Sequence, residues 1–122
     1  MITSEQLKET QDRVEALHRY LDIPAKEMQL AEEKIRTQDP DFWSDAKRAE
    51  EQMKKVKGIE KWVTGYKEVK TMIDELTLAF DYYKEELVTE EEVDATYAKT
   101  IESIEALELK NMLREEEDSM DF

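Results

Sequence analysis

The sequence predicts an all-α fold: an antiparallel helical bundle of about four helices, built on one long helix with coiled-coil-like packing. Apolar side chains recur at steps of three or four from residue 46 to residue 87, which places them on one side of a helix. Only two Gly and two Pro occur among 122 residues, and 41% of the residues are charged, as is typical of long-helix proteins. An all-β fold would need many more turn residues.

The first predicted helix spans residues 4–21, with Thr3 or Ser4 as its N-cap. Its apolar residues recur on one face, which we expect to be buried. They are Leu7, Val14, Leu17 and Leu21, with Thr10 filling the gap between the first two.

The second predicted helix spans residues 24–37 and follows a break in the chain near Asp22. Proline disfavours a helical residue before it but is tolerated in a first turn, and the Asp22 side chain can act as the N-cap. The helix ends before a loop at residues 38–41. The residues expected to face inward are Met28, Leu30, Ala31 and Ile35.

The third predicted helix is the long one, residues 44–87, with Ser44 as its N-cap. Phe42 and Trp43 precede this cap. Two adjacent aromatic residues in this position are typical of a plug that folds back onto the core; the alternative is an exposed pair that binds a partner.

Two glycines, Gly58 and Gly65, lie inside this helical pattern, and each costs about 1 kcal/mol relative to Ala. The apolar stripe continues across both, so one unbroken helix is preferred to two. Its members are Ala46, Ala49, Met53, Val56, Ile59, Val63, Tyr66, Val69, Ile73, Leu76, Phe80, Tyr83 and Leu87.

The fourth predicted helix spans residues 90–113 and begins at a capping box, in which Thr89 caps and Glu92 reaches back to its amide. A short link predicts that it returns antiparallel along the long helix. Residues 114–122 carry a dense acidic run without apolar periodicity and are expected to be a solvated tail or linker. We therefore predict a single helical domain over residues 1–113. Its last inward residues are Val93, Tyr97, Ile101, Ile104, Leu107 and Met112.

Charge is unevenly distributed along the chain, whose formal net charge is −14. Residues 45–70 hold eight Lys or Arg against five acids. Within this stretch Lys47, Lys54 and Lys61 are spaced by seven and form a stripe on one helix face, which makes them our candidates for a partner-binding surface. The alternative is a solvated face laced with ion pairs four residues apart. These pairs would be Glu50–Lys54 and Glu51–Lys55.

No catalytic constellation can be recognised in the sequence. His18 is the only histidine and there is no cysteine, so a His-based metal cluster or a Cys–His pair cannot form. The two glycines do not make a phosphate-binding loop. We expect no catalytic, cofactor-binding or metal-binding residues and no cofactor, and we interpret the chain as a nonenzymatic docking module. No stretch is apolar enough for a signal sequence or a membrane span, so a soluble, cytoplasmic protein is expected.

Three segments resemble the N-terminal domain of bacterial class-1 peptide chain release factors, of the type that reads UGA and UAA. They are "LHRYLDIPAKEMQLAEEKI" (Leu17–Ile35), "DPDFWSDAKRAEEQMKK" (Asp39–Lys55) and "ALELKNMLREEEDSMD" (Ala106–Asp121). The resemblance is collinear over nearly the whole chain. Its most specific parts are Tyr20–Leu21–Asp22 and Pro40–Trp43, because helical segments alone resemble many coiled coils.

The resemblance implies a role in translation termination but not the chemistry itself. Members of the family read stop codons with a serine-proline-phenylalanine motif and promote peptidyl-tRNA hydrolysis with a glycine-glycine-glutamine motif, and this sequence has neither. The chain is therefore expected to be an excised N-terminal domain that docks on the ribosome near the stalk base and its GTPase-associated region, with a functional link to the GTPase release factor. Independent nucleic-acid binding is not expected, and the isolated domain should be a monomer or weak dimer.

A second interpretation remains open at this point. The apolar stripe of the long helix could close between chains, which would make the protein a self-associating coiled-coil scaffold unrelated to termination.

Overall fold

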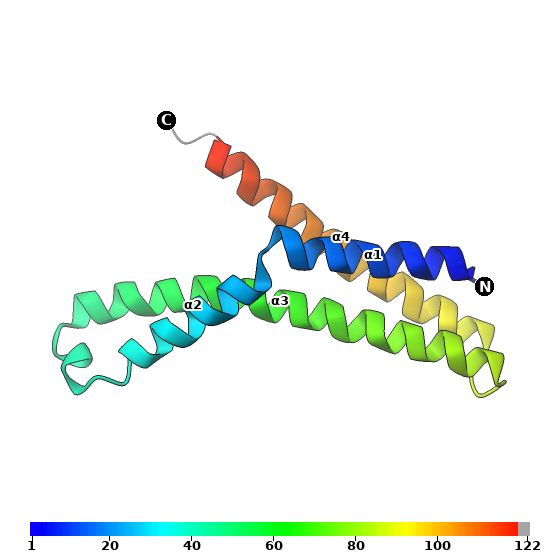
Figure 1. The fold of residues 1–122 in the computed structure, drawn as a ribbon, viewed down its shortest axis with the longest axis horizontal. Helices are drawn as coiled ribbons and strands as arrows, with labels where there is room; N and C mark the ends of the chain where they lie inside the picture. The colour runs from blue at the N-terminus through cyan, green and yellow to red at the C-terminus, as the bar shows by residue number, and fades with distance from the viewer. Residues whose placement is uncertain (120–122) are drawn as a thin grey trace. The chain divides into compact units, whose positions relative to one another are not determined.

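The computed structural model describes residues 1–119, and every regular element in this range is helical (Figure 1). The predicted all-α helical bundle is therefore confirmed. The elements are α1 (Ser4–Tyr20), α2 (Ile23–Arg36), the 3₁₀ helix η1 (Pro40–Ser44), α3 (Ala46–Lys84) and α4 (Glu90–Ser119). No helix within the described range is long and apolar enough to cross a membrane.

The helices form two compact units. The three-helix unit comprises residues 1–20 and the chain from Tyr66 onward, and so contains α1, the second part of α3, and α4. The hairpin unit is Leu21–Gly65, which contains α2, η1 and the first part of α3. The prediction of a single domain over residues 1–113 stays a prediction.

In the three-helix unit, α3 and α4 are joined by a tight turn and run antiparallel (Figure 1). Helix α1 runs parallel to α4, because Ile2 and Arg13 bond to Asp94 and Glu108, in the same order along both segments. The apolar faces of the three helices are buried against one another, as the periodicity predicted. The buried apolar residues are Ile2, Leu7, Val14, Leu17, Val69, Ile73, Leu76, Phe80, Val93, Ile104 and Leu107.

Helices α1 and α4 of this unit each begin at a capping box. The amide of Glu92 donates to Thr89 Oγ1 at 3.2 Å, and the Thr89 amide donates to Glu92 Oε2 at 3.3 Å, as predicted. Thr3 and Gln6 make the same reciprocal pair at the start of α1, at 3.1 and 2.8 Å. Each box satisfies two amides that the first helical turn leaves without partners.

The predicted start of the long helix is wrong by two residues. Ser44 is the last residue of η1, where its hydroxyl donates to the Asp41 carbonyl at 2.6 Å. Asp45 takes an extended backbone conformation and caps α3 instead, accepting from the Arg48 amide at 3.2 Å. Ser44, which the local sequence favoured as the cap of α3, is thus part of the 3₁₀ helix that begins at Pro40.

The predicted end of the long helix is also wrong, because α3 stops at Lys84 rather than Leu87. Glu86 adopts a left-handed conformation with φ 61°. The Leu87 amide then donates to the Tyr82 carbonyl at 2.9 Å and the Glu86 amide to the Tyr83 carbonyl at 3.0 Å. This pair of bonds is a Schellman motif, which ends a helix, and it leaves Leu87 exposed instead of in the apolar stripe. Ala46, at the other end of the stripe, is exposed as well.

The C-terminal acidic segment does not begin as an irregular tail. Helix α4 continues past residue 113 to Ser119, since Glu and Arg are good helix formers and need no apolar face to extend an existing helix. Met112, predicted to face inward, is exposed. Residues 120–122 of the predicted tail lie outside the described residues.

Gly58 and Gly65 lie within the uninterrupted helix α3, which confirms the preference for one helix. A Cβ atom placed on Gly58 would meet nothing within 4 Å. The glycine therefore costs helix stability without a close approach that would require it.

We predict that Gly58→Ala raises the free energy of unfolding by about 0.5 to 1 kcal/mol, because it removes the entropic cost of a glycine inside a helix. Urea denaturation followed by circular dichroism measures this change. A destabilised variant would show that the open space beside Gly58 is needed by the fold.

Candidate functional site

The lysine stripe predicted from sequence lies on the α3 segment of the hairpin unit. Lys47, Lys54 and Lys61 are all exposed there. Lys54 Nζ lies 3.6 Å from Glu50 Oε1, with its side chain 75% exposed. The ion pairs found among the described residues include Lys54 but neither Lys47 nor Lys61. One of the pairs of the alternative interpretation is thus present, and it leaves the charge of the stripe accessible to solvent.

The second pair of that interpretation is replaced. Lys55 Nζ lies 3.3 Å from the carboxylate of Glu33 on α2, not beside Glu51. A second ion pair joins the same two helices, between Lys34 on α2 and Glu60 on α3, at 3.3 Å. Because these pairs join α2 to α3, they hold the two helices of the hairpin unit together instead of lying along one face of α3.

Glu33 is a feature that the sequence analysis missed. Its side chain is only 6% exposed, and it accepts a short hydrogen bond from Gln52 Nε2. Arg36 Nη1 approaches it at 3.7 Å. The hydrogen bond from Gln52 lowers the pKa of Glu33, burial opposes that effect, and Lys55 and Arg36 lower the pKa further. A glutamate on a helix with three acidic and three basic residues carries no sequence signal of burial, which is why it was overlooked.

Helix α2 therefore faces α3 with a different side from the predicted one. Ile23 and Glu33 are its buried residues and Leu30 is half-buried. Met28, Ala31 and Ile35, predicted to face inward, are exposed. At about 100° per residue the two sets lie on opposite sides of the helix, so the prediction chose the more apolar side and the packing uses the other.

The turn before α2 also differs from the prediction. Asp22 makes no side-chain capping bond and instead takes the left-handed conformation, with φ 48° and ψ 57°, which Asp tolerates better than most residues. Its carbonyl accepts from the Lys26 amide at 3.1 Å. Leu21 and Ile23 on either side of Asp22 are buried. Burial of these two neighbours therefore fixes the conformation of the turn.

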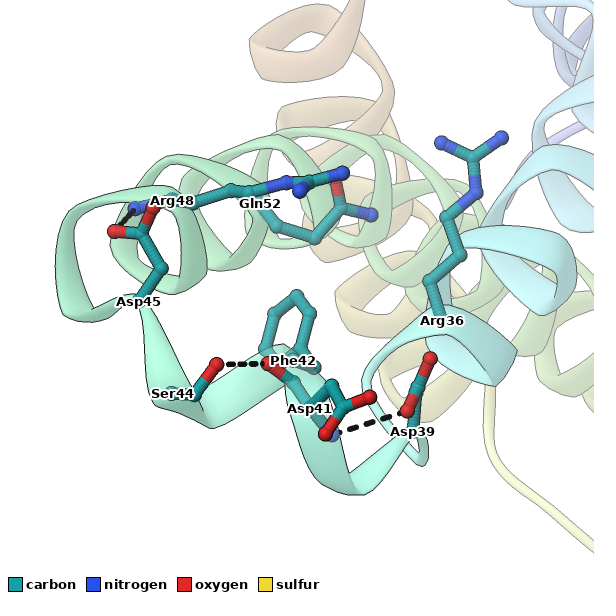
Figure 2. Close-up of a pocket in the computed structure, with 8 residues that line it drawn as sticks. All are labelled: Arg36, Asp39, Asp41, Phe42, Ser44, Asp45, Arg48 and Gln52. Carbon is teal, nitrogen blue, oxygen red and sulfur yellow. Dashed lines mark hydrogen bonds between the residues drawn. The ribbon is translucent and has the colours of Figure 1, made fainter.

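The loop end of the hairpin unit contains a cavity of about 400 Å³ (Figure 2). Figure 2 shows Arg48 and Gln52 on the α3 side of this cavity, and Asp39 and Asp41 on the side formed by the loop. The Asp39 carboxylate accepts from the Asp41 amide at 3.0 Å and so starts η1. The remaining lining residues are Arg36, Phe42, Ser44 and Asp45. Charges of both signs meet here, and no group of three metal-ligating side chains occurs among the described residues.

The two aromatic residues of the loop divide between the two predicted roles. Phe42 is half-buried and lines the cavity. Trp43 is 59% exposed and packs edge to face on Phe42, with ring centroids 4.8 Å apart. Its indole Nε1 donates to the Thr37 carbonyl at 3.2 Å, which closes the end of α2. The pair is thus a plug on one side and an exposed aromatic surface on the other.

His18 has a structural environment. Its ring lies 5.2 Å from the Tyr66 ring, centroid to centroid, between α1 and α3 of the three-helix unit. His18 thus lies at the interface between α1 and α3.

Residues 24–122 match the PCRF domain. The chain belongs to the PCRF family. The match begins at Pro24 in α2 and includes η1, α3 and α4. It identifies a class-1 release factor domain, which is a non-catalytic domain of translation termination and has the ribosome as its general partner. The resemblance seen in the sequence is confirmed at this level.

The structure explains why two stretches carry most of that resemblance to release factors. Tyr20–Leu21–Asp22 forms the turn from α1 to α2, which requires a left-handed residue beside a buried leucine. Pro40–Trp43 forms most of η1, where Pro40 starts the 3₁₀ turn and Trp43 bonds back to α2. Helical positions accept many side chains, whereas these turns depend on particular ones.

We predict that Glu33→Gln destabilises the PCRF domain at pH 7, because the hydrogen bonds from Gln52 and Lys55 favour the charged carboxylate. The lowered pKa means that wild-type Glu33 contributes stability above its unfolded pKa and loses it as the pH falls through the folded value. The difference between the two proteins should therefore shrink in acid. Thermal denaturation at pH 7 and pH 3 measures it.

Glu32→Gln is the matched control, because Glu32 is exposed on the same helix. An equal effect of the two substitutions would show that Glu33 acts only through the net charge of the protein.

Proposed function

We propose that this PCRF domain is the N-terminal ribosome-docking arm of a UGA/UAA-reading termination factor. The proposal rests on the family match together with the collinear resemblance of its turns to that type of release factor. In the full-length factor, segments with the codon-reading and Gly-Gly-Gln motifs would direct stop-codon-dependent peptidyl-tRNA hydrolysis. The PCRF domain would supply binding rather than chemistry, in a cytoplasmic protein.

The observation that carries the docking assignment is the difference in charge between the two units. The hairpin unit has nine Lys or Arg and ten Asp or Glu, whereas the rest of the chain has nine and twenty-two. A surface of rRNA and ribosomal protein repels a strongly acidic unit. The hairpin unit is the part whose balance permits contact, and Lys47, Lys54 and Lys61 are exposed on it.

The lysine stripe is suited to an electrostatic contact near the base of the ribosomal stalk, in the GTPase-associated region. Lys55 forms an ion pair with Glu33 of α2, so its charge is partly neutralised within the fold. Lys47 and Lys61 form no ion pair among the described residues. Lys54 has only an exposed partner, Glu50 at 3.6 Å, and such an exposed ion pair contributes little to stability. Docking there would also give the factor its functional link to the GTPase release factor.

We predict that reversing the stripe, with Lys47→Glu, Lys54→Glu and Lys61→Glu together in the full-length factor, weakens ribosome binding at least about tenfold at low salt. Where the lysines contact rRNA, the slope of log affinity against log salt should also fall by about 0.7 to 0.9 per lost phosphate contact. Equilibrium binding to purified ribosomes across a salt series measures both quantities.

The matched control reverses three exposed lysines of the three-helix unit, Lys8, Lys99 and Lys110. It changes the net charge by the same amount and should have the smaller effect. Equal losses from the two triple variants would assign the effect to net charge, and unchanged affinity of the stripe variant would refute the docking assignment.

The coiled-coil scaffold is the less supported alternative. The apolar stripe of α3 has little surface left to bury against a second chain. Five of its residues are each less than 5% exposed within one chain, namely Ala49, Val56, Val63, Ile73 and Leu76. We predict that the 122-residue chain sediments as a monomer at micromolar concentration, with helical circular dichroism retained. A tight dimer that unfolds on dilution would favour the scaffold instead.

A further inference from the structure

Large exposed apolar side chains gather at one end of the three-helix unit. Leu109, Met112 and Leu113 on α4 are 53%, 55% and 50% exposed, and Tyr20 at the end of α1 is 63% exposed. Because α1 and α4 run parallel, the C-terminal turns of α1 lie beside this part of α4. Single exposed apolar residues are common on proteins, but a group around a groove marks a binding surface.

A groove of about 350 Å³ lies beside this group, with Tyr20 and Met112 in its lining. Ala16 and Tyr20 line it from α1 and Met112 lines it from α4, with the buried Leu17 among the lining residues. The other lining residues are Arg13, Glu108, Asn111 and Glu115. The groove therefore has apolar contact surface between two helices and a polar border.

The width of the groove is fixed by an ion pair between its two walls. Arg13 Nε and Nη2 on α1 donate to the two carboxylate oxygens of Glu108 on α4, at 3.1 and 2.5 Å. The hydrogen bond from Arg13 to Glu108 raises the pKa of Arg13, burial opposes this, and the charges of Glu108 and then Glu105 raise it further. Glu105 thus acts on the same region.

The charge of the groove border is one-sided. At about 100° per residue, Glu105, Glu108 and Glu115 lie within roughly 60° of Met112 around the α4 axis. The basic residues of α4, which are Lys99, Lys110 and Arg114, lie more than about 130° from it. Glu108 is neutralised by Arg13, whereas Glu105 and Glu115 are exposed. Met112, the apolar residue of α4 that lines the groove, is therefore bordered by carboxylates and lies on the side of α4 away from its basic residues.

We infer that this groove, which we call the α1/α4 groove, binds a basic amphipathic helix of a partner protein. The apolar residues of such a helix, spaced by three or four, would cover Tyr20, Leu109 and Met112, and its Lys or Arg residues would reach Glu105 and Glu115. This assignment is independent of the lysine stripe, which lies in the hairpin unit.

Charge decides between the possible occupants. A second copy of this chain would bring the same carboxylate border against itself, and like charges across an interface are unfavourable. Nucleic acid and anionic lipid would be repelled by the acids of the border for the same reason. A positively charged helix satisfies both the apolar surface and its border.

The test uses the 122-residue chain and a fluorescein-labelled helical peptide with Leu at positions spaced by three and four and Lys on both flanks. A scrambled peptide of the same composition is the control for charge. Anisotropy should show binding of the amphipathic peptide with a dissociation constant on the order of 10 to 100 μM at low salt, and at least about tenfold weaker binding of the scrambled one.

Leu109→Ser with Met112→Ser should weaken peptide binding about tenfold or more. Leu78→Ser is the matched control, because Leu78 is 51% exposed on α3 and does not line the groove. All five substituted positions are exposed, so circular dichroism should be unchanged in every variant. Glu105→Gln with Glu115→Gln should reduce the salt dependence of binding.

Three outcomes would overturn the proposal. Equal binding of the two peptides, insensitive to the Leu109 and Met112 substitutions, would show attraction by net charge alone. Absence of binding by the amphipathic peptide would show that the groove does not accept a helix. A concentration-dependent dimer that these same substitutions abolish, seen by sedimentation, would make a second copy the occupant.

Discussion

The structure depends on burying the apolar stripe of α3. Ala49, Val56 and Val63 carry it through the hairpin unit, and Val69, Ile73, Leu76 and Phe80 carry it through the three-helix unit, each no more than 8% exposed. A helix of 39 residues cannot bury such a stripe against itself, and isolated helices are marginal in water. The other helices are therefore needed to cover α3, and the turns that bring them back must be specified closely.

Polar interactions then determine how each covering helix is seated. Glu33, with Gln52 and Lys55, fixes the rotation of α2 against α3, and Arg13 with Glu108 fixes α1 against α4. When one member of such a pair is removed, the other is left without its partner at a site with little water. The resulting loss of stability is larger than that caused by a mismatched apolar contact.

The same arrangement distributes charge in a way that bears on binding. In the hairpin unit, the contact with Glu33 draws Lys55 toward α2 while Lys47, Lys54 and Lys61 stay in solvent. In the three-helix unit, the lysines of α4 lie more than about 130° around the helix axis from Met112. The PCRF domain thus has an exposed lysine stripe in one unit and an acidic groove border in the other, and the two binding proposals rest on this difference in charge.

The sequence by itself determined the helices, the burial of the α3 stripe and the capping box at Thr89, because helical periodicity and capping depend on residues only a few positions apart. It also indicated the class-1 release factor family through two turns whose geometry requires particular residues. It placed the lysine stripe on an exposed face, since a spacing of seven fixes the face once the helix is known. What it could not decide was which side of α2 meets α3.

Only the tertiary structure decided that side, because α2 has apolar residues on the outside and a buried glutamate on the inside, and the choice depends on partners far along the chain. Gln52 and Lys55 are about twenty residues from Glu33, and no local pattern connects them. The same holds for Asp45 replacing Ser44 as the cap, for Glu86 ending α3, and for the α1/α4 groove. Each depends on where two segments meet, which periodicity along one helix does not encode.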